Sequence, residues 1–205
     1  MATSGLFLRS QPRANSRVIT KIPNGTKVKV TKKSGVKGNI GWIEDEWLNV
    51  KFRGRTGYVF GGYLKTIPAP RKEKTEGELS AALVAYVDQA FPSQSQVVET
   101  IEDDVLHCFQ LLSDITIFET EIEGGTRKAS LTFDASNVFD AYVLLEALIY
   151  WNGNTGILES LRFVKNKGGQ IDKISDKEGR ISLTMVSPNQ VKLSITDKAM
   201  ESASN

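Results

Sequence analysis

The sequence predicts two domains, a small all-β barrel followed by an α+β domain with a mostly antiparallel sheet and at least two helices. Short alternating strands with close turns fill residues 5–64, and a helical pattern with longer hairpins follows after residue 76. The length of 205 residues accommodates two modest domains. We place the barrel at residues 1–66, a linker at 67–76, the α+β domain at 77–200 and a disordered tail at 201–205.

The barrel begins with an apolar strand at Leu6-Phe7-Leu8 and a second strand at Val18–Ile22, which the turn Pro23-Asn24-Gly25 ends. Val28 and Val30 then alternate with lysines as a third strand. We expect residues 34–41 to form a polar loop that continues through an acidic tip at residues 42–46.

A tight hairpin within residues 47–64 closes the barrel, with its turn at Arg53-Gly54-Arg55. Side chains alternate across a strand, so the residues of one parity can fill a core: Leu48, Val50, Phe52 and Val59. The same alternation puts three aromatic residues on the opposite face: Trp47, Tyr58 and Phe60.

Several short motifs in this order and spacing carry a family resemblance: Leu8-Arg9 with Pro12, Val18-Ile19, Gly25-Thr26-Lys27-Val28, Trp47-Leu48-Asn49-Val50, Gly54, Gly57-Tyr58-Val59 and Tyr63-Leu64. Together they resemble a bacterial SH3-type (SH3b) domain over about the first third of the chain. The resemblance implies an SH3-like barrel that acts as a recognition module of the bacterial cell envelope and binds peptidoglycan or a protein partner. It also implies an extracytoplasmic location, in the periplasm or cell envelope, with the export signal outside the printed sequence. The segment from Ser34 to Glu46 looks longer than the family pattern and adds Trp42.

In the second domain, Thr75 and Glu78 predict a capping box for an amphipathic helix that Pro92 ends. Residues 97–112 fit a helix or a buried strand. A hairpin around Gly124-Gly125 would pair Phe118 with Leu131 and set Glu121 against Lys128.

The remaining pattern predicts a helix, a strand and a hairpin. The helix Val138–Trp151, capped by Ser136 or Asn137 and closed by Asn152-Gly153, is apolar on nearly every side. It is therefore buried in its own domain or in a homodimer. Residues 158–164 indicate a strand, and residues 181–195 indicate a hairpin. No apolar run reaches the ~20 residues of a membrane span, so we expect none.

Charge is distributed unevenly between the two domains. Residues 1–70 hold 13 Lys and Arg against 3 acids, a net charge of +10, and the remainder holds 13 against 21, a net charge of −8. A patch for an anionic partner is predicted at Lys27, Lys29, Lys32, Arg53 and Arg55. Lysines on an edge strand also prevent aggregation. No nucleic-acid motif accompanies the patch, so we do not expect nucleic acid as the partner.

The sequence offers no persuasive catalytic or metal site. His107 and Cys108 are the only histidine and cysteine, and neighbouring side chains point in different directions, so they do not form a nucleophile and base pair. The acids Glu119, Glu121 and Glu123 indicate a solvated strand face, and those at Asp172, Asp176 and Glu178 lack the spacing of a calcium loop. We expect no catalytic residues, no cofactor and no metal.

The aromatic face is the candidate binding site, because flat rings bury area with little loss of rotamer freedom. The predicted ligand-binding residues are Trp42, Trp47, Tyr58, Phe60 and Tyr63. The alternative is that these rings pack under the long 34–46 segment or on the second domain. Our hypothesis is a non-enzymatic cell-envelope protein that binds a wall peptide, a glycan or a protein partner. The alternatives are a wall-targeted enzyme with its active site in the second domain, and a dimeric scaffold joined through the Val138–Trp151 helix.

Overall fold

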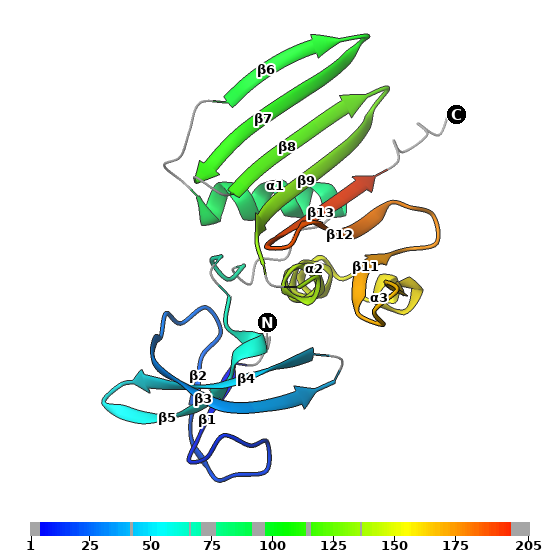
Figure 1. The fold of residues 1–205 in the computed structure, drawn as a ribbon. Coiled ribbons are helices and arrows are strands. Elements are labelled where there is room, and N and C mark those ends of the chain that lie inside the picture. The colour runs from blue at the N-terminus through cyan, green and yellow to red at the C-terminus, as the bar shows by residue number, and fades with distance from the viewer. Residues whose placement is uncertain are drawn as a thin grey trace. The chain divides into compact units, whose positions relative to one another are not determined.

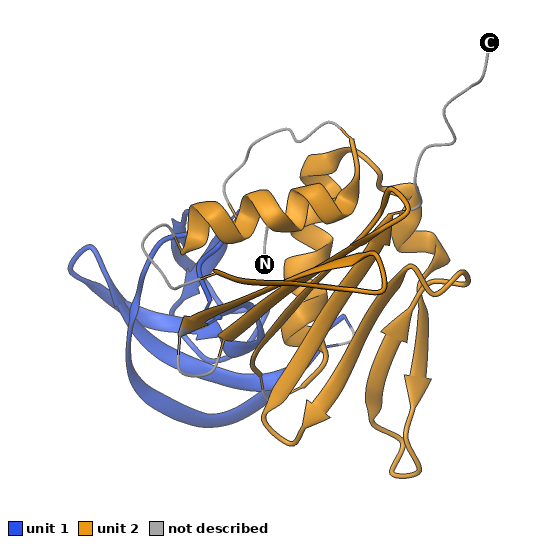
Figure 2. Cartoon of the chain, turned by 90° about the horizontal axis from the view of Figure 1, so that it is seen from above, with its two compact units in different colours: residues 1–69 blue, residues 70–205 orange. Residues whose placement is uncertain are grey.

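The computed structural model describes residues 5–41, 43–65, 67–70, 77–91, 97–113, 116–135 and 137–197. The chain divides into two compact units, Met1–Ala69 and Pro70–Asn205, coloured separately in Figure 2. No helix among the described residues is long and apolar enough to cross a membrane.

The first unit is an antiparallel sheet of five strands in the order β2-β1-β5-β4-β3 (Figure 1). The strands are β1 (Leu6–Arg9), β2 (Val18–Ile22), β3 (Lys29–Ile40), β4 (Ile43–Phe52) and β5 (Arg55–Phe60), and a short 3₁₀ helix, η1 (Gly61–Tyr63), follows. Its core consists of Leu8, Ile22, Val50, Phe52 and Val59. The alternation of the hairpin therefore selected the core residues correctly.

The polar loop expected at residues 34–41 is wrong. Residues 34–40 belong to the long strand β3, which pairs with β4 up to Ile40 opposite Ile43. The expected acidic tip at residues 42–46 is also wrong, because residues 43–46 belong to β4. Opposite charges support this extension, since the Lys37 ammonium lies 3.7 Å from the Glu44 carboxylate. The Glu46 carboxylate also accepts a hydrogen bond from the Gly35 backbone N–H. Trp42, the added tryptophan of this segment, lies outside the described residues.

The second unit is an eight-stranded antiparallel sheet with three described helices, and its strand order is β10-β11-β12-β13-β9-β8-β7-β6. Its strands are β6 (Val97–Glu102), β7 (Val105–Ser113), β8 (Thr116–Glu123), β9 (Thr126–Asp134), β10 (Arg162–Lys165), β11 (Ile171–Ser175), β12 (Ile181–Ser187) and β13 (Gln190–Asp197). Its helices are α1 (Leu79–Ala90), α2 (Phe139–Asn152) and α3 (Gly156–Ser160). The α+β class with a mostly antiparallel sheet is confirmed.

The ambiguous segment 97–112 forms two strands. β6 and β7 pair from Val97 opposite Gln110 to Glu102 opposite Val105. The turn between them holds Asp103 and Asp104 with φ of 49° and 64°. Because aspartate tolerates this left-handed conformation, the acidic run makes a tight hairpin turn and not a helix N-terminus.

Both expected hairpins in this unit are confirmed. Phe118 faces Leu131 and Glu121 faces Lys128 across β8 and β9. Leu183 faces Leu193 across β12 and β13. The strand expected at residues 158–164 is wrong in its first part, because residues up to Ser160 form α3 and β10 begins only at Arg162.

Helix α1 begins at Leu79 with Glu78 at the N-cap position and no side-chain cap from Glu78 itself. Thr75 of the predicted capping box lies outside the described residues. The Asp197 carboxylate at the end of β13 instead accepts a hydrogen bond of 2.6 Å from the Ser80 backbone N–H in the first turn. A hydrogen-bond acceptor for the N-terminus of α1 therefore comes from a strand that is distant in sequence, whereas the capping-box motif predicted an acceptor on a residue next to the helix.

Helix α2 is covered inside its own unit. Asn137 accepts a hydrogen bond from the Phe139 N–H at 3.0 Å, and Gly153 ends the helix with φ of 84°, as expected. The helix packs on α1 and β13, and its buried residues include Leu144, Leu145 and Ile149. These buried residues are not a free dimer surface, so the reason for expecting a dimer through α2 is lost, although dimerisation itself stays untested.

Candidate functional site

The face of the barrel opposite its core is arranged as the alternation predicts. Trp47 faces Phe60 and Asn49 faces Tyr58 across β4 and β5. Because directly paired residues share a face, Trp47, Tyr58 and Phe60 all lie away from the core formed by Val50 and Val59.

Two of these three rings are nevertheless covered. Trp47 and Phe60 are 3% and 1% exposed, and they meet edge to face with centroids 5.7 Å apart. Phe60 makes a second edge contact with Tyr63 at 5.6 Å. The rings pack on one another and do not line an open groove.

Two glycines make room for these rings. A Cβ on Gly38 of β3 would lie 2.6 Å from the Trp47 indole nitrogen. A Cβ on Gly62 would lie 2.7 Å from a Phe60 ring carbon and 2.6 Å from an Ile43 methyl carbon. Trp47 therefore packs on β3 at Gly38, within the 34–46 segment, which is one of the two alternatives that the sequence left open.

The predicted ligand-binding set thus divides into three groups. Tyr58 and Tyr63 are partly exposed, Trp47 and Phe60 are buried, and Trp42 lies outside the described residues. No ligand contact tests this set, so its role in binding stays a prediction.

An accessible aromatic residue that the sequence analysis missed lies on the same face. Phe7 in β1 is 45% exposed. The Arg9 guanidinium lies 5.4 Å and the Lys21 ammonium 5.7 Å from the centroid of its ring. Arg9 faces Tyr58 across β1 and β5, so Phe7 and Tyr58 belong to one surface. The alternation of Leu6-Phe7-Leu8 carried this signal, because Phe7 has the parity opposite to the core residue Leu8.

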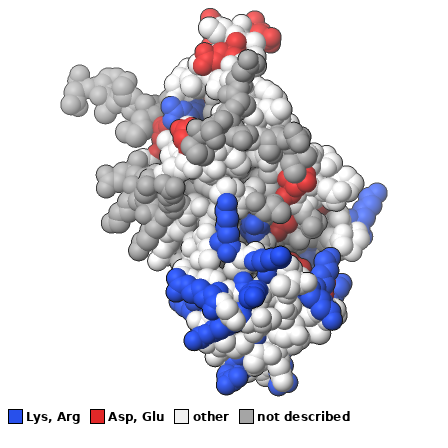
Figure 3. Space-filling view, turned by 90° about the vertical axis from the view of Figure 1, so that its left-hand side faces the viewer, with Lys and Arg blue, Asp and Glu red and all other residues white. Residues whose placement is uncertain are grey.

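The predicted basic patch is solvent-exposed, and Figure 3 shows Lys and Arg side chains gathered over the first unit. Two of its members have local partners. The Arg53 guanidinium lies 5.3 Å from the Phe52 ring centroid, and Arg55 donates a hydrogen bond of 3.2 Å to the Ile19 carbonyl oxygen. The exposed lysines of the patch, Lys27, Lys29 and Lys32, supply positive potential.

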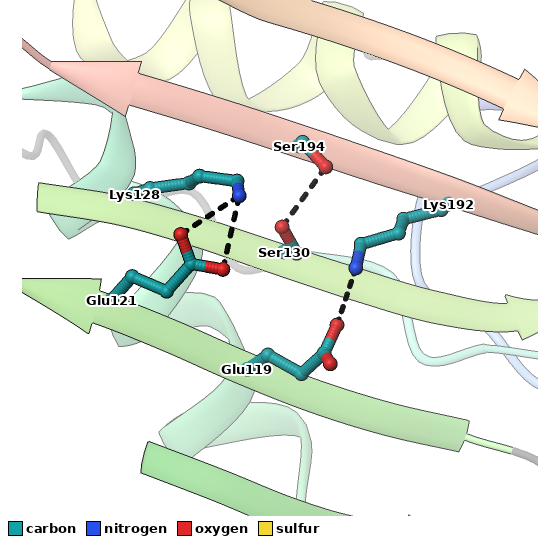
Figure 4. A network of polar contacts seen from close by, with 6 residues as sticks. All are labelled: Glu119, Glu121, Lys128, Ser130, Lys192 and Ser194. Carbon is teal, nitrogen blue, oxygen red and sulfur yellow. Dashed lines mark hydrogen bonds and ion pairs between the residues drawn. The ribbon is translucent and has the colours of Figure 1, made fainter. Parts of the chain in front are cut away.

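Four of the acids considered for chemistry in the second unit have structural partners: Glu119, Glu121, Asp176 and Glu178. On the sheet face shown in Figure 4, Glu121 pairs with Lys128 at 2.8 Å and Glu119 with Lys192 at 2.5 Å. Ser130 and Ser194 share a hydrogen bond of 2.9 Å between these pairs. This is a ladder of cross-strand pairs and not a pair of facing acids.

The contacts of the described residues do not support a calcium site at residues 172–178 or a nucleophile and base pair at His107 and Cys108. The buried Asp176 accepts a hydrogen bond of 2.9 Å from the Ile181 N–H, and Arg180 lies 3.5 Å from its second oxygen. His107 and Cys108 are consecutive residues of β7 that face Thr100 and Glu99. Among the residues that the structure describes, no group of three or more His, Cys, Asp and Glu side chains gathers to hold a metal.

Comparison with known proteins agrees with the barrel and adds nothing for the second unit. The family model of the bacterial SH3 domain matches residues 4–65. No curated protein and no solved structure matches the chain. The match covers all five strands of the first sheet, whose core and strand order are given above. The N-terminal third of this chain is therefore a bacterial SH3 domain.

Proposed function

We propose that the chain is a non-enzymatic protein of the bacterial cell envelope whose SH3 domain binds peptidoglycan or a peptide of a protein partner. Bacterial SH3 domains are often involved in cell-wall binding, which supports this class of function. The proposal includes an extracytoplasmic location.

The observation that carries the proposal is the exposed ring of Phe7, which has the Arg9 and Lys21 cations close to it and lies on the face where Arg9 pairs with Tyr58. The rings offer flat apolar area for an extended chain, and the two cations offer partners for a carboxylate. A peptide with free carboxylates, such as the peptide stem of peptidoglycan, matches this combination. The proposed binding surface is therefore centred on Phe7 and Tyr58, and the buried Trp47 and Phe60 lie on the same face of the sheet.

The enzyme alternative has no observation in its favour. A carboxylate pair such as Asp172 and Asp176 would be needed for it, and Asp176 already accepts a hydrogen bond from the Ile181 N–H and lies beside Arg180.

The test is a pull-down of the intact protein on purified peptidoglycan sacculi at low and high salt. The variants are Phe7→Ala and Tyr58→Ala, and the matched control is Val36→Ala, another exposed apolar residue of the same unit. We expect retention that survives high salt and is lost in the first two variants only. High salt matters because a +10 unit adheres to any anionic polymer when charges are weakly screened.

The proposal would be contradicted if retention of the protein on sacculi disappears at high salt, or if neither substitution reduces it. The same variants tested on a carboxylate-free glycan distinguish recognition of the peptide from recognition of the sugar.

A further inference from the structure

The two edges of the eight-stranded sheet are exposed. Strand β6 pairs only with β7 and β10 only with β11 among the described strands. All six residues of β6 and all four residues of β10 are exposed. Both carry large apolar side chains in the open, Ile101 at 76% and Val164 at 46%. An apolar edge with free backbone groups is a template for another strand.

The two edges carry opposite charge. β6 has Glu99 and Glu102 and no cation, and Asp103 and Asp104 follow it. β10 has Arg162 and Lys165 and no acid. Pairing of two β6 strands or of two β10 strands would bring like charges together, whereas pairing of β6 with β10 brings opposite charges together.

The direction of the strands permits this pairing between copies. Every neighbouring pair in the sheet is antiparallel, so β10 and β6, at the two ends of an eight-strand order, run in opposite directions. A second copy placed beside the first along the hydrogen-bonding direction then sets its β10 antiparallel to β6 of the first copy. The same face of the sheet then points in the same direction in both copies.

One register satisfies charge, apolar contact and side-chain parity together. With Phe163 opposite Ile101, Arg162 lies opposite Glu102 and Lys165 opposite Glu99. Phe163 stacks on Phe139 of α2 with centroids 6.4 Å apart, so it lies on the face that carries the helices. The face on which Ile101 lies follows from the strand pairing, because directly paired residues share a face. Ile101 pairs with Leu106 and Leu106 with Ile122, and Ile122 lies on the same face of β8 as the buried Phe118. Both apolar residues therefore lie on the same face of the continued sheet.

We propose that copies of this chain associate head to tail, with β10 of one copy pairing antiparallel with β6 of the next. The contact uses different surfaces on the two partners, so it extends into rows or rings and does not stop at a dimer. A single short strand pair is small for a protein interface, so the association is weak, grows with concentration and weakens with salt.

The test is sedimentation velocity of the full chain over a range of concentrations at low and high salt. The first variant carries Glu99→Lys and Glu102→Lys, and the second carries Arg162→Glu and Lys165→Glu. All four residues are exposed, so the fold tolerates the changes. We expect the wild-type sedimentation coefficient to rise with concentration at low salt, and each variant alone to stay monomeric.

The decisive result is the equimolar mixture of the two variants. In the mixture, the lysines on β6 of the first variant meet the glutamates on β10 of the second. The native acids on β6 of the second variant meet the native cations on β10 of the first. Both contacts join opposite charges, so we expect association to return. A misfolded variant does not regain association in this way, and circular dichroism of each variant checks the fold independently.

The matched control reverses charge at two exposed cations of the first unit that lie outside its basic patch, with Arg13→Glu and Arg17→Glu. We expect this control to associate like the wild type. The proposal is overturned if the wild type is monomeric throughout, if the mixture stays monomeric, or if the Arg13 and Arg17 control alone abolishes association.

Discussion

At the scale of single residues, the aromatic side chains of the SH3 domain show why parity alone does not identify a binding surface. Phe7 and Trp47 both lie opposite the core, yet Phe7 is 45% and Trp47 only 3% exposed. Trp47 is covered because Gly38 lets β3 lie against the indole. A glycine on a different strand therefore decides whether this aromatic residue is available.

This close approach makes Gly38→Ala a test of the Trp47 environment. An added Cβ would lie 2.6 Å from the indole nitrogen, so the ring or the strand must move. We expect a destabilisation of about 1–3 kcal/mol, the usual cost of overpacking. Chemical denaturation followed by tryptophan fluorescence measures it.

The control for that measurement is Gly156→Ala in α3, where an added Cβ meets no atom within 4 Å. We expect this change to be neutral or slightly stabilising, because alanine favours a helix more than glycine does. Equal losses of stability in the two variants would argue against a specific contact at Gly38.

Tyr86 in α1 gives the protein a pH dependence at the alkaline end. Burial raises the pKa of its hydroxyl well above the ordinary value of 10.0. A group with a higher pKa in the folded chain contributes stability that is fully present below the unfolded pKa. This stability is lost as the pH rises through the folded pKa.

We therefore expect the melting temperature to fall as the pH rises above about 10, and Tyr86→Phe to reduce the steepness of this fall. Thermal melts of both proteins between neutral and alkaline pH measure the difference. Identical pH profiles would show that Tyr86 ionisation does not contribute to alkaline unfolding.

At the scale of elements, hairpins are the units that local sequence specifies best. The turns at Arg53-Gly54 and Gly124-Gly125 have residues with positive φ, and both hairpins form where they were expected. The Asp103-Asp104 turn was missed because its acids also suit a helix N-terminus. Its two positive φ angles come from residues that tolerate this conformation less well than glycine.

Asp104→Gly is expected to stabilise the second unit by a few tenths to about 1 kcal/mol, because glycine adopts φ of 64° without a Cβ penalty. Urea denaturation of the two proteins measures the gain. Lys173→Gly, at a regularly paired position within β11, is the contrasting change and should destabilise, since glycine weakens a strand interior. A loss of stability on Asp104→Gly would show that the carboxylate contributes more than the backbone strain costs.

At the scale of the whole molecule, the chain consists of two units with separate cores and opposite net charge. The first unit has its own core around Leu8 and Val50, and the second has one around Leu131, Leu144 and Leu193. Each buries its apolar residues within a sheet of its own. The two units are therefore expected to fold independently.

Expression of residues 1–69 and 70–205 as separate proteins tests this expectation. We expect each to unfold cooperatively, and the heat absorbed by the full chain in calorimetry to be reproduced by the sum of the two. Fluorescence of the separate pieces distinguishes the units, because Trp42 and Trp47 belong to the first and Trp151 to the second. Failure of either piece to fold alone would mean that its core is incomplete without the other.

The sequence by itself determined the features that depend on neighbouring residues. Strand alternation identified the core of the SH3 domain, turn residues placed the β4–β5, β8–β9 and β12–β13 hairpins, and the spacing of short motifs indicated the family that matches residues 4–65. The helix apolar on all sides was correctly expected to be buried. These signals are local because side-chain direction repeats every two or 3.6 residues.

Only the tertiary structure decided which surfaces are covered and which strands form the edges. The burial of Trp47 depends on Gly38, the hydrogen-bond acceptor for the α1 N-terminus comes from Asp197, and β6 and β10 become edges through the strand order. Each of these facts joins residues that are distant in sequence. The two-residue repeat of strands and the 3.6-residue repeat of helices do not predict such contacts, because packing between elements determines them.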